Sequence, residues 1–205
     1  MSEAAIDRQR RALGFLTVAE TLALAAGGNV VLDPHSILIS SAARIGGDNR
    51  FYPGVTIEAG TGAAIAIGDG NVFWPDTVIA AASGTIAIGN ANQFGPSGFT
   101  ASLDGNGGRI EIGSHGRFRE GASVSAGCIL GDGAQILGPI QAQATILGAG
   151  GDYDKPDPNS RGGVLKGSGR ARGLTIGRGQ VIEGRGHFDR TDIKPQSFYH
   201  PRGAP

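Results

Sequence analysis

The chain has little cysteine, no net charge and no long apolar run. Its single cysteine, Cys128, excludes an intramolecular disulfide framework and suggests a reducing compartment, the cytoplasm. Lys plus Arg and Asp plus Glu both total 18, so the chain lacks the basic excess of a general nucleic-acid or anionic-membrane binder. No run of about 18 apolar residues occurs, so the sequence predicts no membrane span.

Histidine is also scarce and scattered. The four histidines are His35, His115, His187 and His200, and the closest pair, His187 and His200, is 13 residues apart. A zinc site needs three or four converging nitrogen, sulfur or oxygen ligands. We therefore expect no histidine-ligated metal centre in this chain.

The first 28 residues predict a short helical segment. Residues 3–26 are rich in Ala, Leu, Glu and Arg, which are good helix formers. Thr17 and Glu20 have the spacing of a capping box, which predicts a second helix starting at Thr17. Phe15, Val18 and Leu22 fall on one face, which we expect to pack on the end of the next element.

Two other interpretations of this segment are weaker. Its basic residues and apolar stretch resemble a secretory signal, but Asp7 and Glu20 interrupt both parts. A helix lying on a membrane surface would carry a strongly cationic polar face, which this segment lacks.

Glycine is abundant, at 37 of 205 residues, more than twice the usual share of roughly 7 %. Much of it belongs to a sequence repeat that occurs three times: IGGDNRFYPGVTI from Ile45, IGDGNVFWPDTVI from Ile67 and IGNANQFGPSGFT from Ile88. In this repeat and in its more divergent copies, large apolar residues recur every six positions. The anchors before a glycine are Ile45, Ile67, Ile88, Ile112, Leu130 and Ile176.

Three further columns follow from the anchors. Six residues after them come Phe51, Phe73, Phe94, Phe118, Ile136 and Ile182. Twelve residues after them come Ile57, Ile79, Thr100, Val124, Ala142 and Phe188. Two residues before them come Ala43, Ile65, Ile86, Ile110, Cys128 and Leu174, so Cys128 is expected to be a small core residue.

A six-residue apolar period fits neither a helix nor a hairpin meander. It fits a short strand of about four or five residues that ends in a corner before the next strand begins. Three such sides form an 18-residue coil, and stacked coils pair edge to edge at about 4.8 Å. Equivalent inward residues then form columns, and Asn49, Asn71 and Asn92 form a structural ladder of amides at one corner.

These repeats, IGDGNV, IGNANQ, LGDGAQ and IGRGQV, resemble the hexapeptide-repeat superfamily. The resemblance covers roughly 30–147 and 174–190, and it implies an all-β, left-handed parallel β-helix of about six to seven coils with a short N-terminal helical segment. The predicted parts are therefore a helical segment at 1–28, coils at 29–147, an inserted loop at 148–173, a final coil at 174–190 and a tail at 191–205.

The resemblance carries expectations about function. Acyltransferases of this superfamily use one histidine as general base on an acceptor hydroxyl or amine, with a coenzyme A thioester as donor and a homotrimer as the assembly. His115, flanked by glycine at a corner, is the best placed of the four histidines. The plainer interpretation is an exposed corner residue, because neighbouring coils carry Asp48, Gly70, Ala91 and Gly133 there. The metal-dependent carbonic anhydrases of the superfamily need a histidine cluster that is missing.

The basic half of the predicted loop supplies the candidate cofactor contacts. Lys166, Arg170 and Arg172 lie in a glycine-rich stretch that could hold the phosphates of coenzyme A or of a nucleotide-linked sugar. The stretch GSGRARG is not a phosphate-binding P-loop, because it lacks the Gly-Lys-Ser/Thr ending. A mobile loop that binds a partner's acidic surface fits this stretch equally well.

Two aromatic residues complete the list of candidates. Tyr52 and Trp74 hold the same outward place on successive coils, and such apolar patches mark contacts. We expect a subunit interface there, with sugar stacking as the alternative. The sequence thus favours an acyltransferase-like protein, and the alternative is a non-catalytic scaffold whose flat faces make oligomer and partner contacts.

Overall fold

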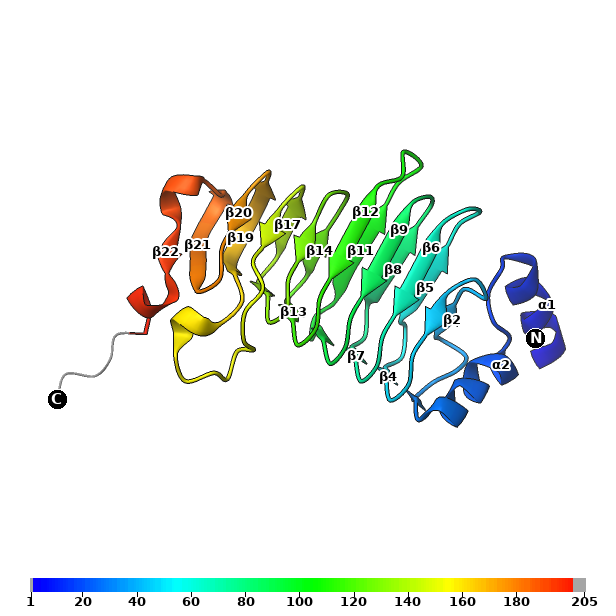
Figure 1. The fold of residues 1–205 in the computed structure, drawn as a ribbon. Coiled ribbons are helices and arrows are strands. Elements are labelled where there is room, and N and C mark those ends of the chain that lie inside the picture. The colour runs from blue at the N-terminus through cyan, green and yellow to red at the C-terminus, as the bar shows by residue number, and fades with distance from the viewer. Residues whose placement is uncertain (1, 201–205) are drawn as a thin grey trace.

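The protein, described here over residues 2–200 of a computed structural model, is built mainly from short parallel strands (Figure 1). The strands form one 15-stranded sheet and one 7-stranded sheet. Each passage of the chain adds a strand to three successive stacks, an arrangement consistent with a parallel β-helix. None of the helices within residues 2–200 has the length and apolarity needed to span a bilayer.

The three stacks define three faces of the molecule. Face 1 stacks β1 (Val30–Val31), β4 (Arg50–Phe51), β7 (Val72–Phe73), β10 (Gln93–Phe94), β13 (Arg117–Arg119) and β16 (Gln135–Leu137). Face 2 stacks β2 (Leu38–Ile39), β5 (Thr56–Ala59), β8 (Thr77–Ala81), β11 (Phe99–Leu103), β14 (Ala122–Val124) and β17 (Ile140–Gln143). Face 3 stacks β3 (Arg44–Ile45), β6 (Ala64–Ile67), β9 (Thr85–Ile88), β12 (Arg109–Ile112), β15 (Ile129–Leu130), β18 (Ile146–Leu147) and β20 (Thr175–Ile176).

Faces 1 and 2 are joined into one sheet by a long strand, β19 (Val164–Arg172). Its first residues pair with β16 on face 1, and its last residues pair with β17 on face 2. β21 (Gln180–His187) then pairs along the length of β19. β19 occupies most of the second half of 148–173, so the prediction that this whole segment is an inserted loop is wrong.

The glycines of β19 explain both its bent course and why 148–173 was predicted to be a loop. β19 bends around a corner at Gly167, where its backbone lies so close to Gly138 and Gly184 that a Cβ on Gly138 or Gly167 would overlap the carbonyl oxygen of the next coil. Only glycine permits this approach. The residues that make the corner therefore look in sequence like a flexible loop. The part outside regular strands is 148–163, which contains a short 3-10 turn at Pro158–Ser160.

The apolar columns form the core. Strand register confirms the anchor column and adds Leu147, which lies between Leu130 and Ile176. The phenylalanine column is also confirmed: ring centroids are 5.1 Å apart for Phe51–Phe73, 5.0 Å for Phe73–Phe94 and 5.5 Å for Phe94–Phe118. It continues through Ile136 and Leu165 to Ile182.

One predicted member of the third column is wrong. Ala101, not Thr100, pairs with Ile79 and Val124, and Ala101 is fully buried. The corner between Phe94 and Ala101 holds one residue more than the corner between Phe73 and Ile79, so a fixed count of twelve from the anchor falls one residue short.

The asparagine ladder is confirmed. Asn49, Asn71 and Asn92 are fully buried. The Asn71 amide nitrogen donates to the Asn49 side-chain oxygen at 3.0 Å, and Asn92 donates to Asn71 at 3.0 Å. Asn29 begins the ladder, because its side-chain oxygen accepts from the backbone nitrogen of Asn49 at 2.9 Å.

The N-terminal segment covers the open end of the stack (Figure 1). It comprises α1 (Glu3–Ala12), α2 (Val18–Ala23) and a 3-10 turn at Leu24–Gly27. The predicted capping box of Thr17 and Glu20 is present. Phe15 and Val18 are buried as expected, but Leu22 is 48 % exposed and does not share their buried face.

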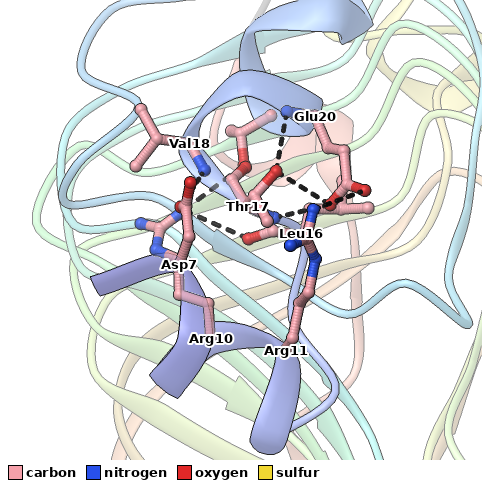
Figure 2. A network of polar contacts seen from close by, with 8 residues as sticks. Asp7, Arg10, Arg11, Leu16, Thr17, Val18 and Glu20 are labelled. Atoms are coloured by element: carbon pink, nitrogen blue, oxygen red, sulfur yellow. Dashed lines mark hydrogen bonds and ion pairs between the residues drawn. The ribbon is translucent and has the colours of Figure 1, made fainter. Parts of the chain in front are cut away.

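An arginine, Arg10, joins this segment to the first strands, and Figure 2 shows its surroundings within the segment. Arg10 is 4 % exposed, and its guanidinium donates to the carbonyl oxygens of Pro34, His35 and Ile37 at 2.9–3.0 Å. Longer bonds reach the Leu16 carbonyl and the Thr21 hydroxyl.

At the other end, the chain folds back over the last coil. A 3-10 turn at Arg190–Asp192, β22 (Lys194–Pro195) and a 3-10 turn at Gln196–Phe198 follow β21, and β22 pairs antiparallel with it. The predicted tail, 191–205, therefore has structure as far as residue 200, and 201–205 lie outside the described residues.

Candidate functional site

His115 lies at the corner between β12 and β13. Its side chain is exposed and its φ is +60°. The equivalent residues Asp48, Gly70, Ala91 and Gly133 have φ between 55° and 68°, so this position has left-handed backbone in these five coils. His115 lines neither of the two clefts described below. Its role as a general base stays a prediction.

The three candidate cofactor residues do not form one cluster. Lys166 pairs in register with Leu137 on face 1, whereas Arg170 pairs with Gln141 and Arg172 with Gln143 on face 2. The corner at Gly167–Gly169 separates them. The sequence analysis grouped these three residues because they are close in the sequence, and no local pattern showed that β19 turns a corner between them.

Arg170 and Arg172 line an open groove of about 630 Å³ on face 2, which we call the face 2 groove. Its remaining polar lining is formed by Ser102, Ser123, Ser125, Gln141, Gln143 and His187. The Arg170 Nε atom donates to the Gln141 side-chain oxygen at 3.3 Å. No acidic side chain belongs to the described lining, so the groove is electropositive and rich in hydrogen-bonding groups.

His187 is a candidate that the sequence missed. It stands opposite Arg170 in the register of β19 and β21, and its side chain is exposed. The signal that could have found it is the alternation of Arg170, Ala171 and Arg172, which fits a strand with its basic residues outward. A partner strand would then bring His187 beside Arg170.

Lys166 lines a smaller cleft of about 270 Å³ on face 1, which we call the loop cavity. Residues of 148–163 and of the C-terminal segment 194–200 cover it. Asn159 and Ser197 join these two covering segments through bonds of 3.0 and 3.1 Å. Lys166 forms an ion pair with Glu183 at 2.9 Å, and His200 also lines the cavity.

Tyr52 and Trp74 stack on the outside of face 1, as the repeat predicts. Their ring centroids are 4.5 Å apart with 17° between the planes. Gly95 follows them in the column, and a Cβ there would collide with Trp74. Leu32, 51 % exposed, precedes Tyr52 in the same column. The N-terminal half of face 1 therefore carries one apolar outward column, beside a second outward column that contains Arg50 and Gln93.

Cys128 is confirmed as a core residue, with no exposed surface. Burial raises the pKa of its thiol, so at neutral pH it is a neutral, unreactive group. Within residues 2–200, no three His, Cys, Asp or Glu side chains gather as metal ligands would.

Comparison with known proteins adds no family: no protein-family model and no curated protein matches this chain.

Proposed function

We propose that the chain is a left-handed hexapeptide-repeat β-helix of about six to seven coils, located in the cytoplasm, that transfers an acyl group from a coenzyme A thioester to a hydroxyl or amine. The observation that carries this proposal is the face 2 groove, where Arg170, Arg172 and His187 lie together. Two guanidinium groups suit the phosphates of such a donor, because arginine binds phosphate through paired N–H groups.

The chemistry needs one base within reach of the acceptor. The base takes the proton of the acceptor hydroxyl or amine as its oxygen or nitrogen attacks the thioester carbonyl. The C–S bond then breaks, and the coenzyme A thiolate leaves and is protonated. His187 is the histidine that shares a groove with the two arginines, so we assign it this role ahead of His115. His115 could act in a site that a second copy completes, as in a homotrimer.

Binding and catalysis are tested separately. Calorimetric titration with acetyl-coenzyme A is expected to show binding that the double variant Arg170→Gln/Arg172→Gln weakens about tenfold or more, since charge-assisted bonds to phosphate are lost. Arg185→Gln is the matched control, because Arg185 is exposed on β21 and lines neither cleft. Absence of heat at millimolar acetyl-coenzyme A would remove the donor from the proposal.

The base is tested by thiol release from acetyl-coenzyme A in the presence of a panel of alcohols and amines. Buried Cys128 contributes little background to the thiol assay. His187→Ala is expected to abolish release and leave donor binding intact, and His115→Ala is expected to change little. The reverse pattern would return the role to His115.

A non-catalytic scaffold is the second candidate, and the stacked Tyr52–Trp74 pair favours it. Face 3 adds a second flat surface, where one outward column consists of Ala66, Ala87, Glu111, Ile129 and Ile146. Sedimentation of the wild type is expected to give a trimer that Trp74→Ala weakens. A trimer that binds no acetyl-coenzyme A would favour this candidate over the enzyme.

A further inference from the structure

The loop cavity has a different character from the face 2 groove. Its floor is the outward side of face 1, where Leu137, Val164 and Val181 present apolar side chains. Tyr153 from the covering loop and Tyr199 from the C-terminal segment form part of its lining. At about 270 Å³, it is slightly smaller than the roughly 300–1,000 Å³ typical of pockets for drug-sized ligands.

Two polar side chains that line this cavity make no hydrogen bond within residues 2–200. Gln135 is 5 % exposed, lines the cavity, and its side-chain amide makes no hydrogen bond to the described part of the chain. The Nε atom of Arg117 is buried and also has no partner within residues 2–200. Polar groups in folded proteins are normally hydrogen-bonded, so an arginine and a glutamine that line one cavity without partners indicate that a ligand pairs with them there.

The charge of the lining indicates the sign of that ligand. Arg117, Arg161 and Lys166 are cationic, and Glu183 is the carboxylate that opposes them. Lys166 is already paired with Glu183 at 2.9 Å, and Arg161 donates to the Lys155 carbonyl at 2.7 and 2.9 Å. Arg117 stacks on the Tyr153 ring at 4.0 Å, and no carboxylate of residues 2–200 forms an ion pair with it.

The surroundings of Arg117 disfavour an unneutralised charge. Burial, and then the nearby positive charge of Arg119, lower the pKa of the Arg117 guanidinium. An anion bound beside it would offset both effects.

We propose that the loop cavity binds a small monocarboxylate with a flat apolar body. Its carboxylate accepts hydrogen bonds from Arg117 and from the Gln135 amide, and its body rests on Val164 and Val181 beside Tyr153. This site is independent of the acyl transfer proposed above, because it lies on another face and uses other residues.

Benzoate is the probe, and benzamide, which has the same shape without the charge, is its matched ligand control. Calorimetric titration of the full chain is expected to show benzoate binding and at least about tenfold weaker benzamide binding, since a charged pair is lost. Equal binding of the two, or no benzoate binding at millimolar concentration, would overturn the proposal.

Arg117→Gln is expected to weaken benzoate about tenfold or more, while Arg50→Gln is expected to leave binding unchanged. Arg50 is the matched control because it occupies the same outward column of face 1, three strands earlier and outside the cavity. Gln135→Leu keeps the size of the side chain and removes the amide, so it tests the site even if Arg117→Gln does not fold. Unchanged benzoate affinity in a folded Arg117→Gln or Gln135→Leu variant contradicts the assignment.

Discussion

The junction between the N-terminal segment and the first strands depends on one buried arginine. We expect Arg10→Met to destabilise the protein, because methionine keeps the apolar stem and removes the guanidinium (Figure 2). The carbonyl oxygens of Pro34, His35 and Ile37 then lose donors at 2.9–3.0 Å. The Ile37 bond is buried, and the other two are partly buried.

The magnitude follows from these differences in burial. An unsatisfied buried group costs about 1–3 kcal/mol, and groups that water can reach cost less. One buried and two partly buried carbonyls therefore lower the free energy of unfolding by about 2–4 kcal/mol. Arg10→Lys is expected to lie in between, because an ammonium group lacks the planar fork that reaches three carbonyls.

Denaturant unfolding followed by circular dichroism measures the loss. Arg8→Ala is the matched control, since Arg8 lies exposed on the same helix, and surface substitutions usually change stability by less than about 0.5 kcal/mol. Stacked repeats contact only their neighbours, so hydrogen exchange is expected to rise first in β1 and β2 and least in β19. An Arg10→Met variant as stable as Arg8→Ala would refute the role assigned to the guanidinium.

Three further predictions concern the stack and the covering loop. Ile67→Asp is expected to prevent stable folding, because it buries an unpaired charge at a site 4 % exposed; a normally melting variant would contradict the column. Asn71→Leu is expected to cost about 2–4 kcal/mol in thermal or denaturant unfolding, since the backbone and side-chain nitrogens of Asn92 and the Gly89 carbonyl lose their bonds to the Asn71 side chain, while the Asn49 side-chain oxygen loses one of its two bonds. The hydrogen-bonded, negatively charged neighbour Asp152 raises the pKa of Asp154, so the folded loop binds this proton more tightly than the unfolded chain does. Its contribution to stability is present below the unfolded pKa and is lost as pH rises through the folded pKa; hydrogen exchange of the loop against pH checks this, and Asp154→Asn should remove the dependence.

The inward columns could be predicted because they repeat. Ile45, Ile67 and Ile88 occupy equivalent positions in successive coils. Each position requires a large apolar residue, so the requirement appears in the sequence as a six-residue period. The asparagine ladder was predictable for the same reason. The capping box of Thr17 and Glu20 was predictable because it is a local arrangement of four residues.

β19 and the clefts beside it could not be predicted in this way. Gly138 and Gly167 are required because the backbones of adjacent coils lie very close together there. In the sequence these glycines look like those of a flexible loop. Because β19 was not predicted as a strand, its pairing with β21, which places His187 beside Arg170, could not be predicted either. The unpaired state of Gln135 depends on contacts across 148–163 and the C-terminal segment, which no local pattern specifies.

The position of both clefts follows from the physics of a stacked coil. A regular stack has flat faces, and a flat face offers no enclosure, so a cleft requires a departure from the repeat. Val30 at one end of the outward column of face 1 is 41 % exposed, and Val181 at the other end is 5 % exposed, because 148–163 and the C-terminal segment cover only that end. The irregular strands β19 and β21 also supply Arg170, Arg172 and His187 to face 2. Small-molecule binding is therefore expected at the C-terminal end, while the regular N-terminal half, with Tyr52 and Trp74 on a flat face, suits contacts with another flat surface.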